Sequence, residues 1–279
     1  MMELCISTSL QVLDNCNWND SKKYLKFMQQ EGSNVVFLVS CLTSQKECVQ
    51  TYFTKLELNP KEAIYSCICE LLQIMPSKKR KHEKFDVDCC CLDSSCILDI
   101  KKTNYDIATR LFVSKALLNG IHGKTKDIID MGLHRFFVLD DDINIDFIKN
   151  SKKLKSTTCQ KIYFLTHIVL IASFYGQKKI NDVTSIWSQT ITTFKKWIEI
   201  LAQKEALKEN IEIWLELLVC LSMLHQKDFF ALYKQKTDSI FKLVKWKRNG
   251  TNAHFFYHTN VLWAFYFAQI KINNTNFKV

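Results

Sequence analysis

Glycine and proline are scarce in this sequence, which contains six Gly and two Pro among 279 residues. Sandwiches, barrels and doubly wound sheets need both residue types at their many turns, so the scarcity argues against these folds. It favours long helices with short connections. With 47% hydrophobic and 24% charged residues, the chain is also too apolar to be disordered and long enough to bury a large core.

Signals for secretion or membrane insertion are also lacking. The N-terminus has no basic region followed by an apolar stretch and a cleavage site. The most apolar stretch, Ile162–Tyr175, is shorter than the roughly 20 residues that span a bilayer, and it contains His167. We therefore expect a cytoplasmic protein without a membrane partner, and a buried helix at this stretch.

Cysteine is abundant but unevenly distributed, with ten of the twelve residues before position 97. In a reducing compartment most of them are expected to be small apolar core residues. The run Cys89–Cys91 with Cys96 lacks the second ligand pair that is typical of a zinc site. We interpret it as part of a mixed core and surface loop, with metal binding as the alternative.

Positive charge is concentrated in the C-terminal part of the chain. Residues 1–100 contain 11 Lys and Arg against 13 Asp and Glu, a net charge of −2, whereas residues 101–279 have a net charge of +12. The basic residues are scattered and form no single stripe, which is typical of solvated helix faces. A nucleic-acid partner is therefore less expected than a protein, peptide or small molecule.

Apolar residues recur every three or four positions along most of the chain, which predicts helices and no strand. Asn59 and Pro60 are typical of a helix start, and Asn119 with Gly120 is typical of a helix end. The predicted helices are 21–28, 35–52, 60–74, 105–118, 128–139, 143–149, 160–175, 181–202, 206–224, 229–245 and 254–270. The predicted fold is all-α, with antiparallel helical hairpins stacked as a curved solenoid or α/α toroid.

Composition divides the chain into three segments. We predict an N-terminal helical part at 1–76, a polar and Cys-rich connection at 77–104, and a C-terminal helical part at 105–279. The connection begins after Pro76, which ends the preceding helix, and it includes the most polar stretch of the chain. The N-terminal and C-terminal parts are expected to form one continuous globular unit.

Two familiar ligand-binding motifs are incomplete. Gly123-Lys-Thr125 lacks the first glycine and the preceding strand of a phosphate-binding loop. Asp140, Asp142, Asn144 and Asp146 have the spacing of a calcium loop but lack its glycine and its final glutamate. These carboxylates are expected to stabilise a helix N-terminus, with a magnesium site as the alternative.

Three polar residues lie inside strongly apolar segments of the predicted helices. They are His167, Glu216 and His258, which are separated by 49 and 42 residues. Each interval is about the length of one helical hairpin, so successive hairpins could present all three side chains to one interior. A buried carboxylate costs several kcal/mol unless it is paired or ligated, and an imidazole is a suitable partner.

We interpret His167, Glu216 and His258 as a candidate catalytic site that binds a divalent transition metal or performs general acid/base chemistry. Thr166, Tyr163 and Tyr257 would be hydrogen-bonding groups around this site. The alternative is structural, because both histidines could bond to helix carbonyls while Glu216 joins a buried polar network that fixes the packing.

The same segments resemble a mainly actinobacterial, all-helical family annotated only as a domain of unknown function. The similarity covers residues 105–270, with Tyr163-Phe-Leu-Thr-His167 and Phe174-Tyr-Gly176, Glu216-Leu-Leu, and Tyr257-His258-Thr259. Gly132-Leu-His-Arg135 matches more loosely. Where an acidic residue is expected before the glycine, this chain has Ser173-Phe-Tyr-Gly176. The resemblance implies an all-helical fold and marks the three site residues, but it implies no activity.

Three functions remain open at this point. The first is an enzyme, or an accessory factor of one, in peptide or small-molecule modification that uses the three site residues. The second is a non-catalytic helical scaffold that binds a protein partner through exposed aromatic residues such as Trp187, Trp197 and Trp246. Nucleic-acid binding through Lys245-Trp-Lys-Arg248 is a weaker third alternative.

Overall fold

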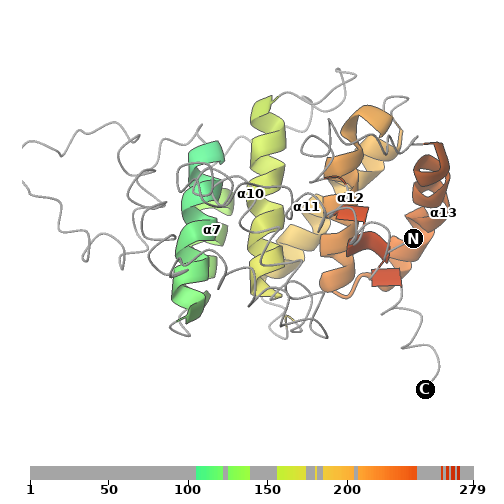
Figure 1. Cartoon of the computed structure of the whole chain (residues 1–279). Coiled ribbons are helices and arrows are strands. Elements are labelled where there is room, and N and C mark those ends of the chain that lie inside the picture. The colour runs from blue at the N-terminus through green and yellow to red at the C-terminus, as the bar shows by residue number, and fades with distance from the viewer. Residues whose placement is uncertain are drawn as a thin grey trace, which may run out of the picture. The chain divides into compact units, whose positions relative to one another are not determined.

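A computed structural model describes residues 105–121, 125–138, 156–173, 180, 185–203, 207–243 and, between 259 and 270, residues 259, 262–263, 265–267 and 269–270. The predicted helices before residue 105, the Cys-rich connection and the acidic run at 140–146 lie outside the described residues. All regular secondary structure in the described part of the chain is helical, which confirms the all-α prediction (Figure 1). None of these helices is long and apolar enough to cross a membrane.

The described helices match predicted ones, with shifts of a few residues at their ends. They are α7 (Tyr105–Ile121), α8 (Thr125–Phe137), α10 (Ser156–Ala172), α11 (Ser185–Ala202), the 3-10 helix η2 (Leu207–Asn210), α12 (Ile211–Met223) and α13 (Lys227–Leu243). Residues 259–270 are also helical wherever they are described. The predicted stop at Asn119 and Gly120 is wrong, because α7 continues through both residues. A glycine inside a helix costs only about 1 kcal/mol, so it does not have to end one.

Two compact units contain these helices. The α7–α10 unit contains α7, α8 and the part of α10 from Gln160 to Ala172. The α11–α13 unit contains α11, η2, α12, α13 and the described residues after 258. The solenoid or toroid arrangement, which concerns the whole chain, stays a prediction.

Aromatic rings join α7, α8 and α10, the described helices of the α7–α10 unit. Tyr105, the first residue of α7, makes edge-to-face contacts with Phe136 of α8 and Phe164 of α10, with ring centroids 6.2 and 5.4 Å apart. Phe112, two turns further along α7, makes a similar contact with Phe164 at 5.7 Å. Since these rings are buried, their packing stabilises the unit through both apolar burial and ring geometry.

Gly132 allows α8 to pack closely against its neighbours. A Cβ at this position would lie 3.0 Å from Ile168 Cδ1 of α10 and 3.0 Å from Phe112 Cε2 of α7. We expect Gly132→Val to lower the free energy of unfolding by about 1–3 kcal/mol, because its two methyl groups would overpack this contact. Chemical denaturation followed by circular dichroism would measure the change. A Gly132→Val variant as stable as wild type would contradict the close packing of α8.

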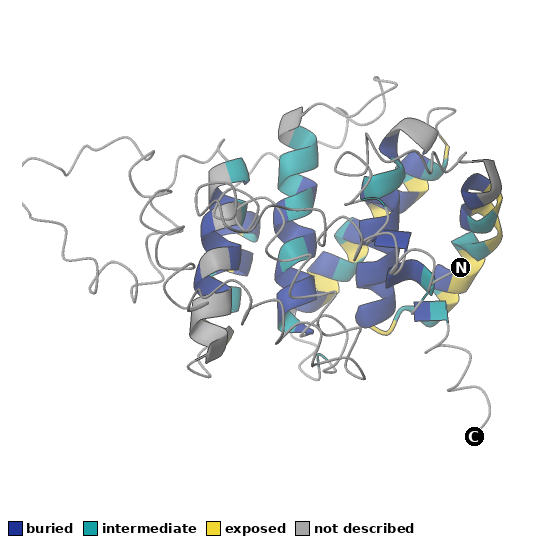
Figure 2. Cartoon of the chain, in the orientation of Figure 1, coloured by how far each residue is buried: buried dark blue, intermediate teal, exposed yellow. Residues whose placement is uncertain are grey.

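Helix α12 is the central element of the α11–α13 unit, where it contacts both α11 and α13. Every residue from Ile213 to Met223 is buried, as Figure 2 shows by its dark colour. A helix that is apolar on all sides must be covered on all sides, and its neighbours supply that cover. Any polar side chain between Ile213 and Met223 is therefore desolvated and needs a specific reason to be there.

Helix α12 ends in a compact motif that turns the chain into α13. The backbone N–H of Gln226 donates to the carbonyl of Leu221, and that of His225 donates to the carbonyl of Ser222. This pair of bonds is the Schellman arrangement, which requires a left-handed residue after the helix. His225 fills this position with φ of 61°. The motif satisfies carbonyl groups that the end of α12 would otherwise leave unbonded.

A buried hydrogen-bond chain joins α12 to α13. Trp214 Nε1 donates to Thr237 Oγ1 at 2.9 Å, and the Thr237 hydroxyl donates to the Tyr233 carbonyl at 2.9 Å. Trp214 and Thr237 are both fully buried. The threonine hydroxyl therefore serves as acceptor and donor at once, which satisfies the indole N–H in the core.

Replacing Thr237 by valine keeps the shape of the side chain but removes the acceptor for Trp214. We expect Thr237→Val to lower the free energy of unfolding by about 1–3 kcal/mol, the usual cost of a buried donor without a partner. Urea denaturation would measure it. Thr237→Ser is the matched control, because it keeps the hydroxyl and loses one methyl group at a cost of about 1 kcal/mol. Equal stability of Thr237→Val and wild type would contradict this bond.

Candidate functional site

His167 lies in α10 and is partly buried. Its Nδ1 is 2.6 Å from the carbonyl oxygen of Tyr163, one helical turn earlier. The rings of Tyr163 and His167 also meet edge to face, with centroids 6.4 Å apart. Thr166 is buried, and its hydroxyl donates to the same Tyr163 carbonyl at 3.0 Å. Two of the three residues predicted to surround the site, Tyr163 and Thr166, thus contribute to the surroundings of His167.

Glu216 lies in the middle of α12, and only 2% of its surface is exposed. Its burial was predicted from the apolar residues around it, and the structure confirms it. One turn later on the same helix, the pKa of the Cys220 thiol is raised well above its ordinary value by burial and, next, by the charge of Glu216. The buried stretch of α12 therefore contains a carboxylate, Glu216, whose charge acts on the Cys220 thiol.

His258 and Tyr257, the remaining predicted residues, lie outside the described residues. The next residue in the sequence, Thr259, is described, and its hydroxyl donates to Glu212 Oε1 in the first turn of α12. Glu212 precedes Glu216 by one helical turn. This hydrogen bond therefore joins the first turn of α12 to the residue that follows His258. Sequence analysis did not single out Glu212, because a carboxylate in the first turn of a helix is ordinary.

Within the described residues, no three His, Cys, Asp or Glu side chains are grouped closely enough to hold a metal ion. His258 is not among the residues covered by that statement. The two described members of the predicted set belong to different compact units, His167 to the α7–α10 unit and Glu216 to the α11–α13 unit. The metal site and the grouping of the three residues stay predictions.

Two buried cations of the α7–α10 unit were missed by sequence analysis. Lys115 of α7 and Arg135 of α8 are 1% and 2% exposed. The Arg135 guanidinium carbon lies 5.6 Å from the centroid of the Tyr105 ring, and Lys161 Nζ lies at the same distance from that ring. Both distances suit cation–π contacts. The only signal in the sequence was the apolar neighbourhood of Lys115, since long basic side chains usually reach solvent.

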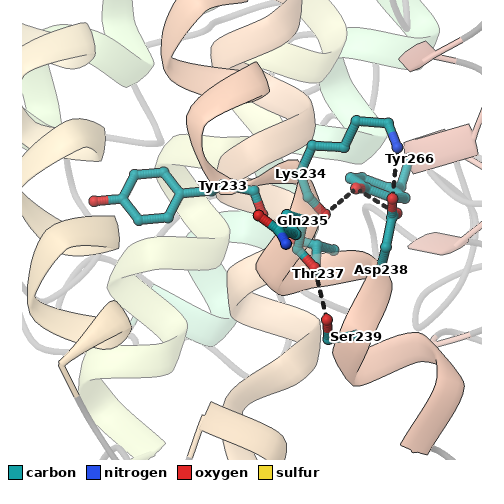
Figure 3. A network of polar contacts seen from close by, with 7 residues as sticks. All are labelled: Tyr233, Lys234, Gln235, Thr237, Asp238, Ser239 and Tyr266. Carbon is teal, nitrogen blue, oxygen red and sulfur yellow. Dashed lines mark hydrogen bonds and ion pairs between the residues drawn. The ribbon is translucent and has the colours of Figure 1, made fainter.

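A polar network fixes the last helical residues against α13 (Figure 3). The Tyr266 hydroxyl lies 3.0 Å from Asp238 Oδ1 and 3.3 Å from the Lys234 carbonyl oxygen, both of which are acceptors. Lys234 Nζ donates to Asp238 Oδ2 at 2.5 Å. Burial raises the pKa of Tyr266 above its ordinary value of 10.0, and the charge of Asp238 raises it further. The side chains of Lys234, Asp238 and Tyr266 thus bond to one another or to the backbone, which ties Tyr266 to α13.

For the scaffold function, three tryptophans were predicted to be exposed, and this prediction is wrong for two of them. Trp187 and Trp197 are both buried in α11, facing the core of their unit. Trp246 lies outside the described residues, as does the Lys245–Arg248 segment. Among the described residues, the large hydrophobic side chains that are exposed are Val138 and Leu232, which belong to different units. The described helices therefore offer less support for an aromatic docking surface than the sequence suggested.

Comparison with known proteins adds no relative: a scan of protein-family models, a search of curated proteins and a search of solved structures each found no match to this chain.

Proposed function

We propose that this protein is a helical enzyme, or an accessory factor of an enzyme, in peptide or small-molecule modification. Its site would consist of His167, Glu216 and His258. These residues would bind a divalent transition metal or act as general acid and base. The proposal is argued from these residues and their surroundings, because no relative supplies an activity.

The observation that carries the proposal is the position of Glu216. A carboxylate in the fully buried stretch of α12 is 2% exposed and raises the pKa of Cys220. Burying such a group is costly, and proteins accept the cost most often where the charge has a use.

The surroundings of the other two residues support the same proposal. His167 bonds through Nδ1 to a helix carbonyl, as the structural alternative predicted, and metal-binding and proton-transferring histidines commonly use the same arrangement. Thr259, which follows His258, is bonded to the N-terminal turn of α12, the helix that carries Glu216. Imidazole and carboxylate together suit zinc and related divalent ions, and the same pair can transfer protons without a metal.

Metal content and stability of isosteric variants would test this function. We expect reduced wild-type protein to contain stoichiometric divalent metal that is lost in folded Glu216→Gln and His167→Gln variants. In the acid/base case no metal is found, and Glu216→Gln is as stable as wild type or more stable, because functional groups are commonly held at a cost in stability. Elemental analysis and urea denaturation would give these values.

Glu199→Gln is the matched control, since Glu199 is an exposed carboxylate on α11 and should change neither metal content nor stability. The proposal is overturned if wild type contains no metal and Glu216→Gln loses about 3–5 kcal/mol, the usual cost of breaking a buried charged pair. Glu216 would then be a structural group, and the scaffold function would be favoured.

A further inference from the structure

We infer that the backbone carbonyl of Tyr163 fixes the tautomer of His167, so that Nε2 is the nitrogen that binds a metal ion or accepts a proton. The role of His167 in this inference rests on the proposed function. The tautomer is inferred from contacts inside α10, so the two can be tested separately.

The first step is the direction of the hydrogen bond. His167 Nδ1 is 2.6 Å from the carbonyl oxygen of Tyr163. A carbonyl oxygen only accepts, so Nδ1 must carry the proton for this contact to be a hydrogen bond. In a neutral imidazole the other nitrogen, Nε2, then holds the lone pair.

The second step is that the surroundings hold the ring in this orientation. Tyr163 supplies both the carbonyl and a ring that meets the imidazole edge to face, at 6.4 Å between centroids and 81° between planes. Residues four apart are neighbours on a helix surface, so α10 itself places the two side chains side by side. The Thr166 hydroxyl bonds to the same carbonyl oxygen. One helical turn of α10 therefore supplies a carbonyl acceptor that favours the Nδ1–H tautomer.

The third step is chemical. A histidine that binds metal usually donates its other N–H to a carbonyl or carboxylate, which orients the ring and makes the binding nitrogen more basic. The Tyr163 carbonyl supplies that acceptor for His167, which makes Tyr163 a positioning residue. The ligand class expected at Nε2 is a divalent transition metal ion, or a proton in metal-free chemistry.

Nitrogen NMR on the full-length protein with ¹⁵N-labelled histidine would test this inference. The His167→Gln variant identifies the signals of His167 by their loss. At a pH where the imidazole is neutral, we expect the Nδ1–H tautomer to predominate, and added Zn²⁺ to shift Nε2 and leave Nδ1 protonated. A predominant Nε2–H tautomer, or a Zn²⁺ response at Nδ1, would overturn the inference.

Two variants separate the carbonyl from the side chains around it. Tyr163→Phe keeps both the carbonyl and an aromatic ring, so the tautomer should not change. Tyr163→Ala keeps only the carbonyl, and Nδ1–H should still predominate; a switch to Nε2–H in this variant would overturn the role of the carbonyl. If Zn²⁺ moves neither nitrogen while Nδ1–H predominates, the tautomer assignment is supported and the metal part of the proposed function is contradicted.

Discussion

Replacing Trp263 by alanine should lower the free energy of unfolding by about 3–5 kcal/mol, as is usual when a large aromatic side chain is removed from a core. Trp263 is fully buried. Its ring centroid lies 4.6 Å from that of Phe241 of α13 and 5.7 Å from that of Tyr266. These rings cannot move together enough to fill the space of an indole, so a cavity would remain. Urea denaturation followed by circular dichroism would measure the loss.

Two comparisons make this result specific to the core of the α11–α13 unit. Trp263→Phe keeps an aromatic ring at the position and should lose less stability than Trp263→Ala. Leu232→Ala removes a large side chain that is 68% exposed, and its effect should stay within about 0.5 kcal/mol. If Trp263→Ala were as stable as Leu232→Ala, the packing of the last helical residues against α13 would be contradicted.

The sequence predicted the described helices well because their apolar residues follow the helical period. In α11 the buried side chains include Trp187, Thr190, Phe194, Trp197 and Leu201, which recur every three or four residues. That spacing places them on one face of the helix. The same spacing contradicts the expectation that the two tryptophans are exposed, so this error arose from treating them singly. Helix ends were less accurate, because local stop signals compete weakly with continued hydrogen bonding.

Buried charge was only partly predictable. Glu216 was recognised because the residues around it, from Ile213 to Leu221, are otherwise all apolar. Lys115 and Arg135 were missed, since amphipathic helices usually direct such side chains to solvent. Whether a long basic side chain is covered depends on which helix packs over it. Local sequence carries little information about that packing.

The candidate site was predictable only in its local part. The contact of His167 with the Tyr163 carbonyl spans one helical turn, and a bond from this histidine to a helix carbonyl was one of the predicted alternatives. The bond between Thr259 and Glu212 joins residues 47 positions apart and depends on how separate helices pack. Hairpin-length intervals between His167, Glu216 and His258 indicate that their segments could converge, but they do not fix which faces meet.

The protein should lose stability as the pH rises above about 9, chiefly because two buried groups resist losing their protons. Unfolded Cys220 ionises near its ordinary pKa of 9.0, and unfolded Tyr266 ionises near 10.0. In the folded protein both pKa values are raised by burial, with smaller contributions from Glu216 and Asp238. Below pH 9 both states hold both protons, so stability does not depend on these groups. Above it the unfolded state releases protons that the folded state keeps, so unfolding becomes easier.

Each group contributes about 1.4 kcal/mol per pH unit once the pH exceeds its ordinary pKa. Urea denaturation between pH 7 and 11 should therefore show a decline that begins near pH 9 and steepens above pH 10. Cys220→Ala should remove the decline between pH 9 and 10. Tyr266→Phe should make the decline above pH 10 shallower by the contribution of one proton. Each variant is compared with its own stability at pH 7, which separates the lost proton from the lost packing. If Cys220→Ala declined like wild type between pH 9 and 10, the thiol would ionise in the folded protein as it does in solution, and the packing around α12 that raises its pKa would be contradicted.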